Sequence, residues 1–352
     1  MFKEGISISN RKIGRNYSPF IIAEMSGNHN QSIEKALEIV DAVAESGADA
    51  IKLQTYTADS LTLNVKGGDF KIKDKSSLWQ GQNLHELYKK SYTPWEWHEA
   101  IFKRAKEKKI ICFSSPFSEE AVDFLEELDT PAYKIASFEN NHLPLIKKAS
   151  ATGKPLIIST GMASLGELEQ AVLTAKEAGC EKIILLKCTS TYPANAKDTN
   201  ISTIKHLRQL FNCEVGISDH TFGIGVSVAS IAFGSSVIEK HFTLARSDGG
   251  VDSQFSMEPK EFSQLVNESK RAWEAIGEIN YGPTKSEEKS LIFRRSIYVA
   301  RDIKKGEKFT YKNLRIVRPG MGAPPYLLSS FIGKTANKSF KKGSPFNFDQ
   351  FL

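Results

Sequence analysis

Two short apolar runs of the chain each end in polar and charged side chains that include a histidine, His220 in the first and His241 in the second. A helix-length segment rich in glycine and small residues separates the two runs. Consecutive buried strands that each end in a histidine can bring both imidazoles to one mouth of an α/β barrel. A lone strand histidine is usually a satisfied core residue, but the nearby Glu24 and Glu239 favour a metal bound by His220 and His241.

The chemistry of the two histidines limits which metal ion they can bind. Two imidazoles without a thiolate do not make a closed structural zinc site. They suit Mn²⁺, with Co²⁺, Fe²⁺ or Mg²⁺ as alternatives, and an open coordination sphere suits a Lewis acid that binds a carbonyl oxygen. The remaining histidines lack such a setting and are expected to be structural or superficial: His29, His85, His98, His142 and His206.

The elements that must position these residues alternate between β-rich runs and amphipathic helical patterns. The expected strands are Phe20–Met25, Ala50–Gln54, Ile110–Ser114, Ala132–Ala136, Pro155–Ser159, Lys182–Cys188, Glu214–Ser218 and Val237–Phe242. Expected helices include Ser32–Ser46, Glu119–Leu128, Leu165–Ala178 and Glu261–Ile276, several of which end at glycine. This order predicts an α/β fold, a (β/α)₈ TIM barrel. A doubly wound open sheet is the alternative, but no GxGxxG motif opens a first helix.

The barrel pattern breaks near residue 280. We expect a barrel domain over 1–280, a linker over 281–291, and a small β-rich domain over 292–352. That last domain has little core of its own and should pack on something else. Within the barrel, the connection from about Thr55 to Tyr92 is long enough to be functional, and its Trp79 and Tyr88 suggest a loop that folds over the mouth. A surface insertion that packs on a neighbour is the alternative.

Composition sets broad limits. The chain has 352 residues, of which 40% are hydrophobic and 25% charged, with a net charge of +6. The positive charge is interspersed with glutamate rather than gathered into a patch, so we expect no nucleic-acid partner. No apolar run spans a bilayer and no signal peptide opens the chain, which predicts a cytoplasmic protein without a membrane partner. The four cysteines, Cys112, Cys180, Cys188 and Cys213, are expected to be reduced core thiols.

Polar residues occupy every predicted strand end. They are Glu24, Lys52 with Gln54, Ser114 with Ser115, Lys134 with Ser137, Ser159 with Thr160, Lys187 with Thr189, Ser218 with His220, and Glu239 with His241. Because side chains alternate along a strand, Lys52 shares a face with Gln54, and Glu239 shares one with His241. Lys52 and Lys134 either form buried salt bridges or converge with serine hydroxyls to bind a phosphate or carboxylate.

These motifs resemble a known family. The stretches Ala23–His29, Ile51–Thr55, Ser114–Ser118, Lys134–Ser137, Ser159–Met162, Cys188–Pro193, Ser218–Thr221 and Glu239–Thr243 are similar to those of the sialic acid synthases, in the same order. The C-terminal region, with Arg294–Ile297 and Arg318–Gly320, resembles their antifreeze-like (SAF) domain. The loop Asp248–Pro259 and the stretch Thr93–His98 resemble the pseudaminic acid synthase branch.

The resemblance implies that phosphoenolpyruvate condenses with the open-chain aldehyde of an acetamido sugar. For that branch the sugar is 2,4-diacetamido-2,4,6-trideoxy-L-altrose. N-acetylneuraminate or legionaminate synthesis, from N-acetylmannosamine or a diacetamido-trideoxymannose, is the alternative. A metal-dependent aldolase and a non-catalytic sugar-binding protein are further alternatives, and phosphate release separates the synthase from both.

The resemblance also implies roles for individual residues. The metal on His220 and His241 would polarise the aldehyde, and Glu24 and Glu239 would act on water and a sugar hydroxyl. Phosphoenolpyruvate would contact Lys52, Ser115, Lys134, Ser137, Ser159, Ser190 and Ser218, and the sugar would contact Gln54, Tyr192, Asp252 and Arg318. In the family, the arginine at the Arg318 position reaches into the partner subunit's barrel, which implies a domain-swapped homodimer.

Overall fold

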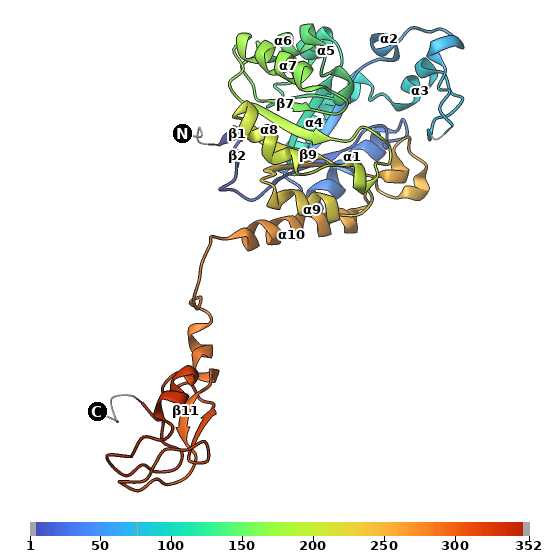
Figure 1. Ribbon diagram of the computed structural model, residues 1–352. Helices are drawn as coiled ribbons and strands as arrows, with labels where there is room; N and C mark the ends of the chain where they lie inside the picture. The colour runs from blue at the N-terminus through green and yellow to red at the C-terminus, as the bar shows by residue number, and fades with distance from the viewer. Residues whose placement is uncertain (1–4, 76, 348–352) are drawn as a thin grey trace. The chain divides into compact units, whose positions relative to one another are not determined.

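The computed structural model describes residues 5–75 and 77–347, and the chain divides into two compact units, Met1–Gly277 and Glu278–Leu352. In the first unit, parallel strands alternate with helices (Figure 1). The barrel strands are β3 (Phe20–Glu24), β4 (Ala50–Thr55), β5 (Ile111–Pro116), β6 (Tyr133–Ile135), β7 (Leu156–Ser159), β8 (Ile183–Cys188), β9 (Glu214–Ser218) and β10 (Val237–His241).

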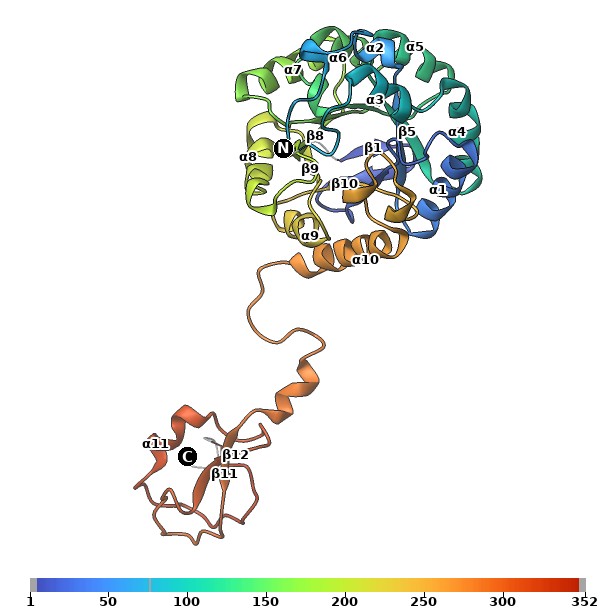
Figure 2. The same ribbon diagram turned by 90° about the vertical axis from the view of Figure 1, so that its right-hand side faces the viewer.

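These eight described strands form a closed barrel in which β10 pairs with β3 and β9. The helices around it are α1 (Ile33–Glu45), α4 (His98–Glu107), α5 (Glu119–Glu127), α6 (Leu143–Ser150), α7 (Leu165–Glu177), α8 (Thr203–Phe211), α9 (Gly225–Ala232) and α10 (Pro259–Ile276). Figure 2 shows them as a ring outside the strands. The predicted TIM barrel is confirmed, and the observed strands begin and end within two residues of the expected ones.

Local signals explain the helix ends. Ser32 accepts a hydrogen bond from the Lys35 amide at the start of α1, and Ser164 forms a capping box with Glu167 at the start of α7. Gly47 and Gly179, which follow α1 and α7, have φ angles of 83° and 96°, a backbone conformation that glycine adopts without steric cost.

An N-terminal hairpin was not predicted from the sequence. Its strands, β1 (Ile6–Ile8) and β2 (Arg11–Ile13), pair antiparallel. Ile8 and Ile13 pack among the interior side chains at the N-terminal ends of the barrel strands, such as Phe20 and Val237. The hairpin therefore closes that end of the barrel.

The segment predicted as a long loop after Thr55 contains two helices, α2 (Ala58–Leu61) and α3 (Leu84–Ser91). These two helices were not predicted from the sequence. Viewed along the barrel, this segment lies across one end of the ring (Figure 2).

The second unit has its own apolar core, which includes Phe309, Phe331 and Phe346. Its strands β11 (Ser296–Val299) and β12 (Leu314–Val317) pair antiparallel, and α11 spans Leu328–Phe331. Outside these two strands, isolated bridges link further residues, such as Lys308 and Thr335. Among residues 5–75 and 77–347, no helix combines the length and apolar character needed to cross a bilayer.

Candidate active site

The interior of the barrel is layered along its axis. The layer beside the N-terminal hairpin is apolar and contains Phe20, Ile22, Ala50, Phe113, Ala132, Ile157, Ile184, Leu186 and Val237. Further along the same strands, the buried side chains of the same parity are polar: Glu24, Lys52, Ser115, Lys134, Ser159, Ser218 and Glu239. The intervening residues of these strands, including Ile51, Leu53 and Ile238, pack in the outer core against the helices. The predicted alternation is therefore confirmed at β4 and β10.

Two lysines and two glutamates form one buried charge cluster. Lys52 is ion-paired with Glu24, and its Nζ lies 3.8 Å from Glu239 Oε2. Lys134 Nζ lies 3.5 Å from Glu239 Oε1, which also accepts a 3.0 Å hydrogen bond from Ser218 Oγ. The salt-bridge alternative is thus confirmed. It does not exclude a bound anion, because both ammonium groups lie among buried serines of the same interior layer.

The environment separates the pKa values of the two glutamates. Burial raises the pKa of Glu24 to about 7, although Lys52 acts against it. Burial also acts to raise the pKa of Glu239, but Lys134 and Lys52 outweigh it and lower that pKa below its usual value. Glu24 can therefore exchange a proton near neutral pH, while Glu239 stays ionised.

Serine hydroxyls surround the lysines. Ser115 Oγ accepts a 3.2 Å hydrogen bond from Lys52 Nζ. Ser159 Oγ is buried and has no hydrogen-bond partner within the described part of the chain. A buried hydroxyl without a partner is costly, so its presence beside this cluster favours a polar ligand.

Gly161 brings two more of the predicted serines together. A Cβ atom at this position would overlap Ser190 Oγ and would lie 2.5 Å from Ser137 Oγ. Only a residue without a side chain lets the loop after β7 approach both hydroxyls this closely. Two of the predicted phosphate-contacting serines, Ser137 after β6 and Ser190 after β8, therefore converge.

The two histidine rings face one another at the strand ends, with centroids 5.3 Å apart. His220 Nδ1 lies 3.0 Å from the Thr189 carbonyl, so in neutral His220 that nitrogen donates its hydrogen and Nε2 carries the free lone pair. His241 Nδ1 is buried and lacks a hydrogen-bond partner among the described residues. Burial, followed by the charges of His220 and Lys52, lowers the pKa of His241 far below its usual value and keeps it neutral.

These features fit the predicted open metal site. Neutral imidazoles bind divalent metals at about 2.1 Å, and rings at this separation can reach a shared ion. Within residues 5–75 and 77–347, no group of three or more His, Cys, Asp or Glu side chains gathers as a metal centre. An ion held by His220 and His241 would therefore keep coordination positions for water or substrate oxygens.

A cavity of about 450 Å³ lies beside the two histidines and is lined in part by His241. The predicted sugar contacts Gln54, Tyr192 and Asp252 line it together with His241. The Tyr192 ring lies 4.4 Å from His220 and 6.4 Å from His241, measured between centroids. Three of the predicted sugar-binding residues are thus placed beside the candidate metal ligands.

Two residues of the stretch Ala23–His29 hold Asp252 in place. Ser26 Oγ donates to the Asp252 carboxylate, and the Asp252 amide donates to Asn28 Oδ1 at 3.3 Å. Asn28 Nδ2 also donates to the Phe242 carbonyl at 2.8 Å, which fixes the start of the loop. The motif after β3 therefore positions the loop that carries the sugar-binding aspartate.

The 55–92 segment packs over the cavity. Trp79 Nε1 donates a 3.2 Å hydrogen bond to the Val251 carbonyl, and the Trp79 ring lies 6.0 Å from that of Tyr192. Tyr56, Leu84 and other residues of the segment line the cavity. The expectation that this segment folds over the mouth is confirmed.

Sequence reasoning missed two residues of the site. Glu139 follows β6 in a short 3₁₀ helix and lines the cavity, and its Oε2 atom is buried without a partner in the described part of the molecule. Cys188 was expected to be a core thiol, but its Sγ lies 3.9 Å from His220 Nδ1 and 3.5 Å from Ser190 Oγ. Neither residue stands out in the sequence, because Glu139 lies beyond the strand repeat and Cys188 ends an apolar run.

Some polar strand-end residues lie elsewhere. Ser114 Oγ contacts Thr55 Oγ1 at 2.6 Å and has the parity of the outer core, and Lys187 Nζ donates to the Cys188 carbonyl. Ser114 and Lys187 therefore do not contribute to the charge cluster in the barrel interior. Arg318 belongs to the second unit, where it is exposed at the end of β12.

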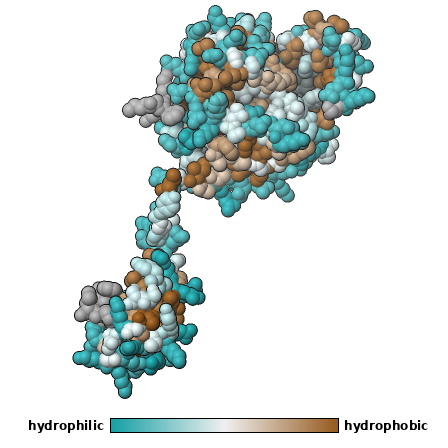
Figure 3. All heavy atoms as spheres, viewed as in Figure 1, coloured by the Kyte–Doolittle hydropathy of each residue, from teal (hydrophilic) through white to brown (hydrophobic). Residues whose placement is uncertain are grey.

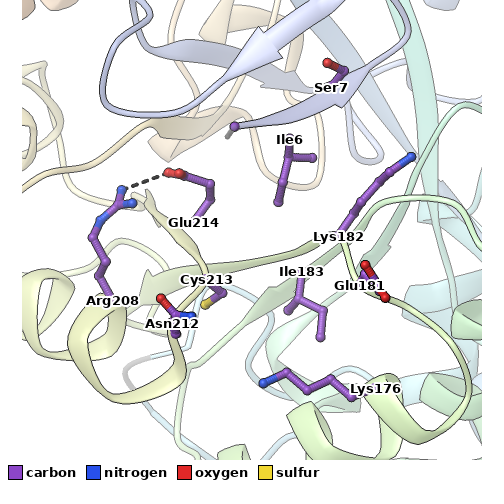
Figure 4. A pocket seen from close by; sticks show the side chains of 11 residues that line it. Ile6, Ser7, Lys176, Glu181, Lys182, Ile183, Arg208, Asn212, Cys213 and Glu214 are labelled. Atoms are coloured by element: carbon purple, nitrogen blue, oxygen red, sulfur yellow. Dashed lines mark ion pairs between the residues drawn. The ribbon is translucent and has the colours of Figure 1, made fainter. Parts of the chain in front are cut away.

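A second cavity, of about 370 Å³, lies at the N-terminal ends of β8 and β9 (Figure 4). Its lining includes Ile6 of the hairpin, Lys182 and the ion pair between Arg208 and Glu214, whose atoms are 2.9 Å apart. Catalytic residues of such barrels sit at the opposite, C-terminal face. The cavity beside His241 is therefore the candidate active site.

Comparison with known proteins agrees with the fold and identifies the family. The NeuB family model matches residues 39–281, and the SAF domain model matches residues 294–352. The barrel carries strand-end histidines and lysines and is followed by an SAF domain. This combination defines a family of synthases. The chain belongs to the NeuB family, which confirms the predicted relation to the sialic acid synthases.

Several relatives cover almost the whole chain. A pseudaminic acid synthase of Campylobacter jejuni is 45% identical over 92% of this chain and 94% of its own length. The pseudaminic acid synthase of Helicobacter pylori is 42% identical over 94% of this chain and 97% of its own length. An N,N'-diacetyllegionaminic acid synthase of Campylobacter jejuni is 38% identical over 92% of this chain and 97% of its own length. The crystal structure of an N-acetylneuraminic acid synthetase from Leptospira borgpetersenii, in complex with citrate, is 32% identical, with a TM-score of 0.73 over 81% of this chain and 94% of that one.

Proposed function

We propose that this protein is a pseudaminic acid synthase. It condenses phosphoenolpyruvate with the open-chain aldehyde of 2,4-diacetamido-2,4,6-trideoxy-L-altrose and releases phosphate. The observation that carries the proposal is one barrel mouth that joins two facing histidines to two buried lysines and a set of converging serines. Relatives of that name at 42% and 45% identity favour this sugar over the legionaminic precursor, whose synthase is 38% identical.

The chain's own residues would carry the reaction as follows. Lys52 and Lys134, with Ser115, Ser137, Ser159, Ser190 and Ser218, bind the phosphate and carboxylate of phosphoenolpyruvate. Gln54, Tyr192 and Asp252 orient the sugar so that its C1 faces C3 of the enol. A divalent ion on His220 and His241, which we propose to be Mn²⁺, supplies Lewis-acid polarisation of the aldehyde oxygen.

Bond formation between C3 and C1 leaves positive charge at C2, which the fixed ionised Glu239 stabilises. Water adds to C2, and the C–O bond of the tetrahedral intermediate breaks to expel phosphate. Glu24 is the better suited of the two carboxyls to take the water proton, because its pKa of about 7 lies near the working pH. Glu239, with a lowered pKa, remains an anion throughout.

The test is a phosphate-release assay with phosphoenolpyruvate, Mn²⁺ and a panel of sugars. We expect release with the diacetamido-trideoxyaltrose and little with N-acetylmannosamine. Preference for a diacetamido-trideoxymannose would assign the legionaminic reaction instead. Carbon–carbon bond formation without phosphate release would identify an aldolase. The domain-swapped homodimer and the cytoplasmic location remain predictions.

A further inference from the structure

Four aliphatic side chains of the 55–92 segment line the cavity: Leu61, Ile72, Leu84 and Leu87. We call this set the apolar wall. Asp74 and Ser77 also line the cavity from the same segment. The polar groups that the strand ends and their following loops supply, by contrast, include Gln54, Glu139, His241 and Asp252. The cavity therefore offers a sugar a polar floor and a partly apolar cover.

Aromatic residues of the same segment are fixed by contacts within it and with neighbouring loops. Tyr56 packs against Tyr88 and Phe117 at centroid distances of 6.0 and 5.2 Å, and its hydroxyl bonds Ser91 Oγ at 2.8 Å. The indole N–H of Trp79 is likewise engaged, by the Val251 carbonyl. Figure 3 shows hydrophobic surface among the residues over α2 and α3. The Tyr56 hydroxyl and the Trp79 N–H are thus already paired within the protein.

The chemistry of such a surface is selective. A sugar hydroxyl pressed against aliphatic carbon loses its water without gaining a partner, whereas a methyl group there is favourably buried. A surface of this kind discriminates between a substituent and its shorter or more polar analogue by about 10- to 200-fold. The polar floor remains available for the aldehyde end of the molecule and its remaining hydroxyl.

We propose that the apolar wall sets the substrate class of this site. It receives the apolar substituents of the sugar, namely the deoxygenated C6 methyl and an acetamido methyl, and so selects deoxy acetamido sugars over fully hydroxylated ones. This inference rests on the proposed function, because it assigns part of that same site.

The experiment compares two sugars that differ only at C6: 2,4-diacetamido-2,4,6-trideoxy-L-altrose and its 6-hydroxylated form, 2,4-diacetamido-2,4-dideoxy-L-altrose. The kcat/KM for phosphate release is measured with wild type, Ile72→Asn and Leu84→Asn, all at saturating phosphoenolpyruvate. We expect wild type to prefer the 6-deoxy sugar by about 10-fold or more, and each variant to lose most of that preference. The KM for phosphoenolpyruvate should not change. Both side chains are half-buried, so their replacement spares the segment's core.

Leu63→Asn is the matched control. Leu63 lies in the same segment, is 64% exposed and is not among the residues that line the cavity, so its variant should keep the wild-type preference. An unchanged preference in folded Ile72→Asn and Leu84→Asn would overturn the inference.

A binding measurement separates this inference from the proposed function. The two alditols obtained by reducing these sugars lack the aldehyde and cannot react. Calorimetric titration should show tighter binding of the 6-deoxy alditol by wild type, and equal binding by the two wall variants. Selective alditol binding without phosphate release from any sugar would contradict the proposed function and support the wall. Equal binding of both alditols by wild type would contradict the wall.

Discussion

The Lys240 ammonium lies 3.0 Å from the Asp219 carboxylate, and both residues are almost fully buried beside the candidate metal ligands. Lys240 Nζ also donates to the Thr221 carbonyl at 2.5 Å, and Asp219 accepts hydrogen bonds from the Thr221 amide and Ser227 Oγ. The pair therefore ties the strand that ends in His241 to the loop that carries His220. Such supporting contacts usually orient metal-binding imidazoles.

Lys240→Met should weaken metal activation. We expect the Mn²⁺ concentration for half-maximal activity to rise by about 10- to 100-fold, because loss of the ammonium frees the His220 loop. Metal titration of turnover measures this. Arg208→Met, which breaks the ion pair with Glu214 at the opposite end of β9, should lower stability and leave metal activation unchanged. If Lys240→Met does not fold, Asp219→Asn provides the same comparison. Unchanged metal activation in a folded variant would refute the role.

Removing either candidate metal ligand should reduce turnover more strongly than removing Lys240. His220→Ala and His241→Ala should each lose about 1,000-fold in turnover, because Lewis-acid activation contributes several kcal/mol and each 1.36 kcal/mol is tenfold in rate. His206→Ala, on the exposed face of α8, is the control. Full turnover of His220→Ala with added Mn²⁺ would show that the metal assignment is wrong.

Gly161→Ala should selectively impair phosphoenolpyruvate binding. The added methyl would displace the Ser137 and Ser190 hydroxyls. Hydrogen bonds to charged groups contribute about 1.5–3 kcal/mol each, so we expect the KM for phosphoenolpyruvate to rise by about 10-fold or more and the sugar KM to stay similar. Gly166→Ala, where a Cβ meets nothing within 4 Å, should leave both KM values unchanged. Equal KM values in the two variants would remove these serines from the phosphate site.

Glu139 should give the protein a pH-dependent stability penalty. Burial raises the pKa of Glu139 from 4.5 to about 7. Because the folded-state pKa is the higher one, stability is fully present below pH 4.5 and is lost as the pH rises through 7. Glu139→Gln should therefore raise the free energy of unfolding by on the order of 2 kcal/mol at pH 8, with a much smaller gain at pH 5.

Denaturant unfolding at a series of pH values measures this difference. Glu167→Gln is a control of opposite sign, because hydrogen bonds from Ser164 lower the pKa of Glu167, so its ionised form adds stability as the pH rises. A Glu139→Gln effect that does not vary with pH would contradict the raised pKa.

Arg318→Ala tests the proposed contribution of the second unit. If Arg318 binds the sugar in a partner subunit, its removal should raise the sugar KM by about 10-fold or more and leave the KM for phosphoenolpyruvate unchanged. Arg315→Ala, which changes an exposed arginine within β12, is the matched control. A sugar KM that stays at the wild-type value would remove the main support for the swapped arm. Mixing Arg318→Ala with a barrel variant such as His241→Ala should restore part of the activity if subunits exchange arms.

The barrel and much of its site follow from local patterns in the sequence. Alternation along a strand already placed Lys52 with Gln54 and Glu239 with His241, because neighbouring side chains of a buried strand face opposite sides. Apolar runs that end in polar residues fixed the strand ends to within two residues.

Other features depend on contacts between distant segments. The hairpin strands span three residues each, too short for a periodic signal, and owe their place to packing inside the barrel. Glu139 sits in a 3₁₀ turn without periodicity, and Cys188 resembles a core thiol until His220 is folded beside it. The α2–α3 segment is polar enough to read as a loop, and only its contacts with Tyr192 and Val251 reveal its position.

The hairpin and the apolar layer beside it fill the N-terminal end of the barrel. We expect substrates to enter and leave at the C-terminal face, past the 55–92 segment. The proposed contacts for phosphoenolpyruvate lie deeper in the barrel, and those for the sugar lie nearer the opening. This difference in depth predicts ordered binding and release. Phosphoenolpyruvate binds first and the sugar binds over it. Inorganic phosphate dissociates after the nine-carbon acid.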